Sequence, residues 1–384
     1  MPIASYSAGQ MSGGFADVQR LARQAVADGV IPGAVIHVSS EERTAFHEPF
    51  GHRTVEPGPL PATVGTIYDV ASVTKAAITS VLAMQAVAAG TVRLDDPVQR
   101  HLPEFRDEES GAAKGQVTVR QLLSHAGGLP AHRPFYLTVP EGPARRLRIM
   151  EAAAREPLAG PPGVRSVYTD LGFILLGWLL ERVAGERLDV QARRRIFEPL
   201  GLRASLFAPV SEGAGAAPKT WPGELGPVAA TEACPYRQRV VAGEVHDMNA
   251  FAMEGVAGHA GLFSTAADLA VIAQALVAAW RGDAGATLVD RDVVRAFWLP
   301  AGVPGSTWRL GWDGPADAKS QAGTRLSRAA VGHLGFTGCS LWIDPARALI
   351  IVLLSNRIHP AVRDDPRFRA FRPAVHDAIL EALG

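Results

Sequence analysis

The tetrapeptide Ser72-Val73-Thr74-Lys75 places a hydroxyl group and an amine one helical turn apart, directly ahead of an apolar run. A Lys at i+3 lies on the same helix face as the Ser, and a serine becomes a good nucleophile only when a neighbouring base takes its proton. The chain holds only four lysines, so chance would supply about 0.2 Ser-x-x-Lys pairs. A Ser that caps a helix, followed by a surface Lys, is the structural alternative. The other motifs of the chain have to distinguish the two interpretations.

Two further segments carry residues of related chemistry. Tyr168-Thr169-Asp170 follows a Pro-Pro-Gly turn and opens an apolar helix, and His333-Leu334-Gly335 stands just before a strand-like run. Together with Ser72-Val73-Thr74-Lys75 they resemble the motifs of the serine β-lactamase and penicillin-binding-protein superfamily: Ser-x-x-Lys, Tyr-x-Asn, and Lys-Thr-Gly or a variant such as His-x-Gly. The resemblance is to the class C-like branch, which also holds DD-peptidases, esterases and transesterases. It covers about residues 15–384.

Periodic apolar patterns predict helices and strands in a particular order. Strand patterns occupy residues 33–39, 44–47, 310–312, 331–335, 340–343 and 349–354. Helical patterns occupy residues 15–30, 72–89, 118–124, 144–154, 171–183, 190–198, 266–279, 291–297 and 372–383. We therefore expect one α/β domain from residues 1–70 and 285–384, and a mainly helical inserted domain over residues 71–284. The resemblance implies an α+β, class C β-lactamase-like fold: an antiparallel sheet flanked by helices, beside a helical domain, with the active site between them.

The resemblance also implies a role for each motif residue. Ser72 would attack a carbonyl carbon and form an acyl-enzyme, with the backbone N–H groups of Ser72 and Phe336 stabilising the oxyanion. Gly335 would keep the strand edge free of a side chain, so that a substrate can lie against it. Lys75 and Tyr168 would share the general-base work, and the sequence leaves open which of them takes the proton.

Two residues depart from the pattern of the lactam-cleaving members. Asp170 stands where Asn is usual; it can only accept hydrogen bonds when ionised, and its charge favours a protonated Lys75. His333 stands where a Lys holds the carboxylate of the antibiotic, and a histidine is often neutral at pH 7. Both changes speak against efficient β-lactam cleavage, although an unchanged role for Asp170 and a DD-peptidase with His at the third motif are alternatives.

Residues 243–249 and 258–261 form a second polar cluster, which includes His246, Asp247 and His259. A cleft wall, a metal site and a hydrogen-bonded structural loop are the alternatives; the spacing matches no established ligand pattern, which favours the loop. His125 is interpreted as a structural residue at a helix end. The chain lacks Gly-x-Ser-x-Gly, Walker A and dinucleotide motifs, so we predict no cofactor and no metal.

Composition limits the partners and the location. Hydrophobic residues make up 47% of the 384 residues, enough for a large core, and the formal net charge is zero. A neutral chain gives no reason to expect a nucleic-acid or membrane partner. Cys234 and Cys339 are predicted to be free thiols. The N-terminus shows no charged and apolar signal-peptide pattern, which predicts a cytoplasmic protein.

The chain is therefore predicted to be a serine hydrolase acting on a small-molecule acyl substrate; its oligomeric state is left open. Asp170 and His333 favour a carboxylesterase for small or medium acyl esters. The alternatives are a β-lactamase or DD-peptidase, an acyltransferase, and a non-catalytic penicillin-binding-like module. The complete set of motifs speaks against the last.

Overall fold

The structure is a computed structural model and describes residues 14–41, 43–107, 109, 111–208, 210, 223–316 and 320–384. Residues 1–13, on which the predicted location rests, lie outside this range. The helices are α1 Ala16–Ala27, α2 Val81–Ala88, α3 Val98–His101, α4 Gly111–Gly115, α5 Val119–Leu123, α6 Phe135–Thr138, α7 Arg145–Arg155, α8 Asp170–Ala184, α9 Leu188–Ala192, α10 Met248–Ala252, α11 Ala266–Arg281, α12 Arg291–Trp298 and α13 Pro366–Leu383. Short π- or 3-10 segments are η1 Lys75–Ser80, η2 Arg193–Phe197 and η3 Gly223–Leu225. The strands are β1 Gly33–Ser40, β2 Arg43–Thr54, β3 Leu60–Pro61, β4 Tyr68–Asp69, β5 Leu206–Phe207, β6 Ala230–Cys234, β7 Arg239–Ala242, β8 Leu262–Ser264, β9 Val331–Leu334, β10 Ser340–Asp344 and β11 Leu349–Ser355.

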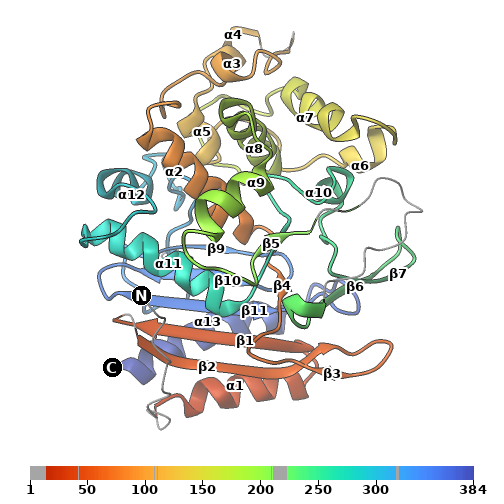
Figure 1. Cartoon of the computed structure of the whole chain (residues 1–384), viewed down its shortest axis with the longest axis vertical. Helices are drawn as coiled ribbons and strands as arrows, with labels where there is room; N and C mark the ends of the chain where they lie inside the picture. Colours follow the sequence, from red (N-terminus) through yellow and green to blue (C-terminus); the bar gives the residue numbers. More distant parts are fainter. Residues whose placement is uncertain are drawn as a thin grey trace.

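A six-stranded sheet joins the two ends of the chain (Figure 1). Its order is β3-β2-β1-β11-β10-β9, and all neighbouring strands are antiparallel. In the register, Ile36 of β1 lies opposite Leu353 of β11, and Leu341 of β10 lies opposite His333 of β9. The predicted α+β fold with an antiparallel sheet is confirmed. β9 is an edge strand, so the third motif lies at the rim of the sheet.

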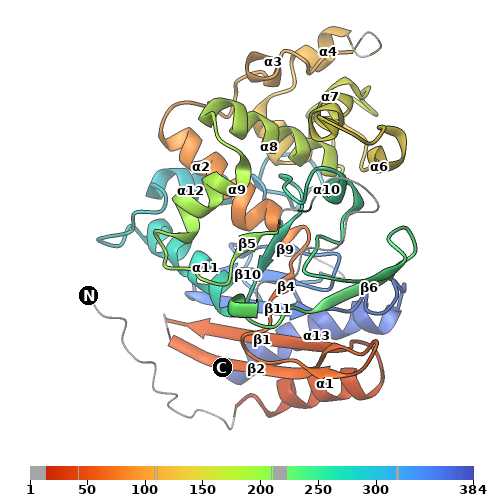
Figure 2. The ribbon, with the colours of Figure 1, turned by 45° about the vertical axis from the view of Figure 1, so that its right-hand side comes forward.

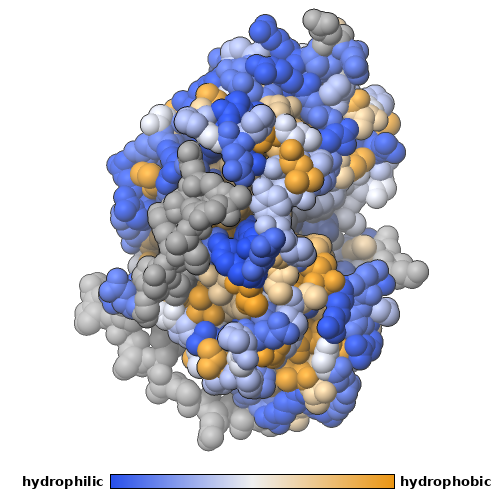
Figure 3. Space-filling model, turned by 90° about the vertical axis from the view of Figure 1, so that its right-hand side faces the viewer, coloured by the Kyte–Doolittle hydropathy of each residue, from blue (hydrophilic) through white to orange (hydrophobic). Residues whose placement is uncertain are grey.

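Alternate side chains of β11 enter two different cores, as the two-residue period of a strand requires. Leu349, Ile351 and Leu353 pack in the core that α1 and α13 cover. Ile350, Val352 and Leu354 belong to the larger core, which continues through α11 into the helical region. Figures 1 and 2 show this layering: α1 and α13 cover one face of the sheet, and the helices α2–α10 stand beyond the other. Figure 3 shows a mostly hydrophilic helical half, with hydrophobic residues gathered in the other half.

The helical region is built around α8, whose residues 171–180 are all buried. The loop before β8 packs tightly on this helix: a Cβ atom on Gly258 would lie 2.1 Å from the carbonyl oxygen of Phe173. The segment η1 also contacts α8, and it has π-helical turns, a feature that is frequent at functional sites. The Ser80 hydroxyl donates to the Lys75 carbonyl oxygen over 2.8 Å within it. These contacts fix the backbone that carries Lys75.

Two predicted elements are wrong in part. No strand forms over residues 310–312, because Gly311 has φ +80° and turns the chain against Ser80; only Asp313 bridges to Gly332 of β9. The last helix begins at Pro366 rather than Arg372, with the Asp365 side chain accepting the Arg367 N–H. The domain boundaries stay a prediction; α11, which lies in the span assigned to the helical domain, contacts β1 and β11.

Within the described ranges, no helix combines the length and the apolar character that a membrane span needs. The helix α8, which carries the buried apolar run of residues 171–180, has 15 residues. A bilayer core requires about 20.

Candidate active site

A cleft of about 710 Å³ lies where the three motifs meet. It is lined by the turn ahead of η1, the start of α8, the loop before α10, and β9 with the turn that follows it. Its residues are Ala71, Ser72, His132, Tyr136, Tyr168, Asp170, His246, Asp247, Met248, Ala260, Trp308, Asp313, His333, Leu334, Gly335, Phe336, Arg357 and Arg372. The structure therefore brings Ser72, Tyr168, Asp170, His333, Gly335 and Phe336 together, and Lys75 lies buried directly behind them.

A strained turn presents Ser72 at the head of η1. Ala71 has φ +48°, which is unfavourable for a residue with a Cβ atom. The buried carboxylate of Asp69 holds this turn: it accepts the N–H of Ala71 at 2.8 Å and that of His246 at 2.7 Å. The Thr337 hydroxyl also donates to the Asp69 carbonyl oxygen at 2.7 Å. Asp69 thus links the nucleophile to two cleft walls. Our sequence reasoning missed it, since its only signal is its place three residues before Ser72.

Lys75 makes three short polar contacts. Its Nζ atom lies 2.9 Å from Ser72 Oγ, 2.8 Å from Asp170 Oδ1 and 3.0 Å from the His259 carbonyl oxygen. A carboxylate and a carbonyl can only accept hydrogen bonds. A neutral amine, with two N–H groups, would give both to Asp170 and the His259 carbonyl. Its lone pair would then have one direction left, toward the Ser72 hydroxyl.

The resting charges of the site follow from this arrangement. Burial alone would lower the pKa of Lys75, but the Asp170 charge, the neighbouring Tyr168 and their hydrogen bonds raise it above its ordinary value. Burial would raise the pKa of Asp170, but Lys75 and His132 hold it far below its usual range. Burial raises the pKa of the Tyr168 phenol, although Lys75 acts in the opposite direction. The free site therefore holds an ammonium–carboxylate pair and a neutral phenol.

Tyr168 stands in an aromatic group. Its ring stacks on Trp308 with centroids 5.5 Å apart, and it contacts His125 at 4.8 Å. Lys75 Nζ lies 4.9 Å from the centre of the Tyr168 ring. Buried His125, at φ +57°, accepts the Thr169 N–H on Nδ1 at 3.2 Å. His125 therefore supports the Tyr168 motif through packing and one hydrogen bond, which fits the predicted structural role.

The third motif presents a neutral histidine. Burial and the charge of Lys75 lower the pKa of His333 to about 3. Its Nδ1 atom lies 2.8 Å from the Leu334 carbonyl oxygen and must therefore carry the proton. The Nε2 atom is then an acceptor; it is buried, and no described residue bonds to it. His333 can accept a hydrogen bond from a substrate, but it supplies no positive charge.

The turn after β9 approaches Ser72 closely. A Cβ atom on Gly335 would lie 2.4 Å from the Val70 carbonyl oxygen, so packing already requires glycine here. Phe336, 49% exposed, follows it in the cleft wall. Within the described chain, the backbone N–H groups of Ser72 and Phe336 donate to no backbone acceptor. Both are thus available to a developing oxyanion, although the oxyanion role itself stays a prediction.

The second polar cluster forms a cleft wall. His259 Nε2 lies 2.8 Å from Asp247 Oδ1, the same oxygen that accepts the Ala250 N–H at the start of α10. The ring of His246 stacks on Phe336 with centroids 5.6 Å apart. Across the described residues, no group of three or more His, Cys, Asp or Glu side chains could hold a metal ion. The second polar cluster is therefore both a wall of the cleft and a hydrogen-bonded loop.

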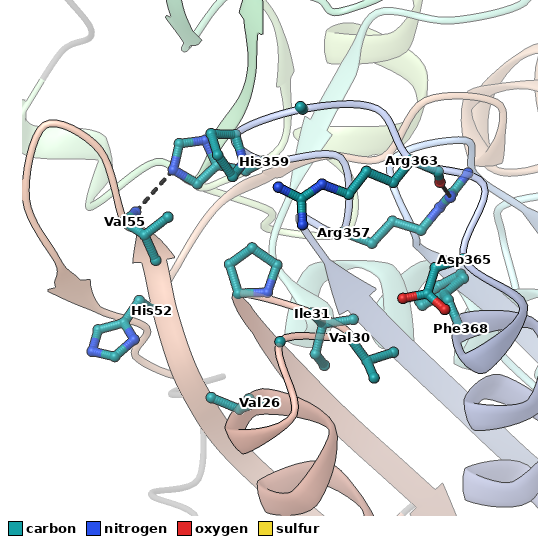
Figure 4. A pocket seen from close by; sticks show the side chains of 14 residues that line it. Val26, Val30, Ile31, His52, Val55, Arg357, His359, Arg363, Asp365 and Phe368 are labelled. Carbon is teal, nitrogen blue, oxygen red and sulfur yellow. Dashed lines mark hydrogen bonds between the residues drawn. The ribbon is translucent and has the colours of Figure 1, made fainter.

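Two arginines at one end of the cleft escaped the sequence reasoning. Arg357 follows β11; its Nε donates to the Phe336 carbonyl oxygen at 3.1 Å, and its Nη1 donates to the Arg363 carbonyl oxygen at 3.3 Å. Arg357 and Phe368 also line a second cavity of about 280 Å³, which is shown in Figure 4. Arg372 of α13 is 5% exposed and packs over Phe368. Burial and Arg357 lower the pKa of Arg372 to about 10, so it stays a cation at pH 7.

The family model described as Beta-lactamase matches residues 18–374. The chain is 34% identical to a "Putative D-alanyl-D-alanine carboxypeptidase" of Escherichia coli (strain K12), over 80% of this chain and 72% of that protein. It is 32% identical to an "N-acetylmuramyl-L-alanine amidase" of Bacillus subtilis (strain 168), over 90% of this chain and 82% of that protein. The structure of "EstCE1, a hydrolase with promiscuous acyltransferase activity" superposes with a TM-score of 0.72 at 22% identity, covering 95% of this chain and 98% of that one. At that identity, the last match supports the fold alone.

Proposed function

Because this chain belongs to the β-lactamase family and is a serine hydrolase by fold and relatives, we propose that it cleaves an amide bond in a small substrate that carries a free carboxylate. The acyl group would be transferred to Ser72 and then to water. The catalytic roles are those predicted from the motifs: Ser72 as nucleophile, Lys75 and Tyr168 as proton-transfer groups, and the N–H groups of Ser72 and Phe336 as oxyanion donors.

The pair of cleft arginines carries this proposal. In the described part of the chain, no ion pair joins Arg357 or Arg372 to a carboxylate. Arg357 gives two of its N–H groups to carbonyl oxygens, and Nε of Arg372 is buried without a partner among the described residues. Arg372 is a buried cation without a carboxylate partner among the described residues, which is costly, so a bound anion would stabilise it. Half-buried Arg357 would contribute a second positive charge. Guanidinium groups match carboxylates in shape and charge.

The relatives support an amide rather than an ester substrate. The proteins that share 32% and 34% identity with this chain carry the names of an amidase and a carboxypeptidase. A peptide or an N-acylated amino acid would supply both the amide bond and the carboxylate. The missing cation at His333, which favoured an esterase, is thus offset by cations elsewhere in the cleft.

A carboxylesterase is the second candidate, and neutral His333 is the observation that favours it. An ester of a small acid needs no cation for its recognition. The acyl-enzyme chemistry at Ser72 is the same for both substrates, so only the relative rates distinguish the two candidates. An acyltransferase would differ only in its acceptor.

The test compares an N-acylated dipeptide that has a free C-terminal carboxylate with the same dipeptide as its C-terminal amide. We expect the carboxylate form to have at least about a tenfold higher kcat/KM, equivalent to roughly 1.4 kcal/mol. Arg357→Gln and Arg372→Gln should each reduce this preference. Exposed Arg363 lines the second cavity but not the cleft, so Arg363→Gln is the matched control. Rapid cleavage of p-nitrophenyl esters with no carboxylate preference would replace this proposal by the esterase.

A further inference from the structure

His132 is a titratable side chain that lies in the cleft with Tyr168 and Asp170, and no motif contains it. Its Nδ1 atom lies 3.6 Å from Asp170 Oδ2, while the other oxygen of the same carboxylate accepts from Lys75 at 2.8 Å. The side chain of His132 is 48% exposed and lines the cleft. One carboxylate therefore stands between a buried ammonium and an imidazole that reaches solvent.

The backbone holds His132 at this position. The carbonyl oxygen of Ala131 accepts the Asp170 N–H at 2.9 Å, and that of Pro130 accepts the Thr169 hydroxyl at 2.6 Å. On the other side, the Asn249 side chain donates to the Arg133 carbonyl oxygen at 2.8 Å. The loop of His132 is thus tied to the second motif and to α10.

The geometry creates a need for a proton acceptor. Lys75 rests as an ammonium, yet it can take the Ser72 proton only after it has lost one of its own. Loss of that proton would leave Asp170, which is only 19% exposed, as a carboxylate without its cation, and an unpaired charge with little access to solvent is unfavourable. The site needs a second cation that can form beside Asp170 when Lys75 becomes neutral.

We propose that His132 is this group: it holds the proton that Lys75 gives up, so that Asp170 is always paired with one cation. The reactive form is then Lys75 amine, Asp170 carboxylate and His132 imidazolium, which has the same number of protons as the resting form. This inference rests on the proposed function, since it assumes that Ser72 attacks an acyl group and that Lys75 receives its proton.

Every proton that moves during one acylation has a donor and an acceptor in this site. In the reactive form, the Ser72 O–H proton moves to the Lys75 amine while Oγ bonds to the carbonyl carbon of the substrate. The ammonium of Lys75 then gives this proton to the leaving nitrogen as the carbon–nitrogen bond breaks. The proton on His132 takes no part in these bond changes and returns to Lys75 when the site goes back to its resting form.

The charges around His132 favour this role. Asp170 and Asp247 stabilise the imidazolium, and Arg133 opposes it; the interaction with Asp170 outweighs burial and raises the pKa of His132 above its ordinary value. The positive charges on Lys75 and His132 also disfavour each other, so the two sites titrate as a coupled pair. Loss of the Lys75 proton therefore strengthens proton binding at His132.

The test is the pH dependence of Ser72 labelling by a fluorophosphonate, in which the Oγ–P bond forms and fluoride leaves. In the wild type, the reactive and resting forms hold the same number of protons, so the labelling rate should change little with pH between the titration of His132 and that of Lys75. His132→Gln can only lose the Lys75 proton to solvent, so its labelling rate should rise about tenfold per pH unit over the same interval and lie below that of the wild type at the lower end of it. NMR titration should also show a lower His132 pKa in Asp170→Asn than in the wild type.

His101 pairs with Asp96 at 3.0 Å outside the cleft, so His101→Gln is a matched control that should keep the wild-type profile. A His132→Gln profile of unchanged shape, whatever its absolute rate, would overturn the inference and leave His132 as a positioning residue. Absence of Ser72 labelling in the wild type would instead refute the proposed function. The two failures are therefore distinguishable.

Discussion

Replacement of Asp170 by Asn tests the charge arrangement of the site most directly. The side chains have nearly the same size, but Asn carries no charge, so the ammonium of Lys75 loses its partner. Because Lys75 must become a neutral amine before it can accept the Ser72 proton, we expect Asp170→Asn to react faster than the wild type at neutral pH. The acid limb of its pH–rate profile should also move to lower pH.

The size of this effect follows from the 2.8 Å distance between Lys75 Nζ and Asp170 Oδ1. At an effective dielectric constant of about 20, two unit charges at this separation attract each other by about 6 kcal/mol. Asp170 is 19% exposed and shares its charge with His132, so part of the attraction is screened. If screening leaves about a third of the attraction, Asp170→Asn removes about 2 kcal/mol of stabilisation from the Lys75 ammonium. The amine fraction of Lys75 at pH 7 then rises about thirtyfold, since one pKa unit is equivalent to about 1.4 kcal/mol.

The assay is the hydrolysis of p-nitrophenyl acetate between pH 5 and about pH 10, with kcat/KM fitted at each pH. Asp95 forms a surface ion pair with Arg120, so Asp95→Asn controls for the loss of an ion pair in general and should leave the profile unchanged. A slower Asp170→Asn enzyme with an unmoved acid limb would show that Asp170 orients Lys75 rather than holding its proton, and the reasoning would fail.

Further predictions concern the other motifs. Lys75→Ala and Tyr168→Phe should each lower kcat by about 100-fold or more, the usual cost of losing general-base catalysis, and the double variant should be little worse than the worse single one; fully additive losses in single-turnover kinetics would place the two residues in separate steps. Gly335→Ala puts a Cβ atom 2.4 Å from the Val70 carbonyl oxygen, so the turn carrying the N–H of Phe336 must shift; we expect kcat to fall at least about tenfold with little change in KM, as loss of an oxyanion donor does. His333 has a folded-state pKa of about 3, below that of the unfolded chain, so the folded state binds fewer protons and the free energy of unfolding should fall as the pH drops from about 6.5 toward 3. His333→Asn should therefore lose less stability than the wild type between neutral pH and about pH 4, measured by thermal denaturation. If stability depends on pH equally in both proteins, His333 is not buried in its neutral form.

Local spacing was enough to predict that Ser72 and Lys75 lie in contact. Ser72 and Lys75 are three residues apart on one helical face, so their contact depends on one turn of backbone. Tyr168 and Asp170 open a helix whose apolar pattern is unmistakable in the sequence. The strand patterns at both ends also predicted most of the sheet, because β1, β9, β10 and β11 are almost wholly buried.

The residues that were missed depend on contacts between distant segments. His132 meets Asp170 because the loop before α6 is bonded to the start of α8, and Arg372 reaches the cleft from α13, some 300 residues after Ser72 in the chain. No spacing rule predicts such encounters. The start of α13 is different: Asp365-Pro366 is a readable helix-start signal, with a cap residue and Pro in the first turn. The failed strand over residues 310–312 reflects the positive φ of Gly311, which an apolar pattern does not reveal.

The charges of the cleft separate binding from chemistry. Lys75 and Asp170 form a neutral pair beside Ser72, and His333, where the family often has a Lys, is neutral as well. Arg357 and Arg372 line the cleft beyond the turn of Phe336, and no carboxylate among the described residues forms an ion pair with either of them. On the proposed function, we expect an anionic group of the substrate to bind at this end of the cleft and not at the reacting atoms. It follows that substitutions of the two arginines should act mainly on KM, whereas substitutions beside Ser72 should act mainly on kcat. A large fall in kcat with unchanged KM in Arg372→Gln would contradict this separation.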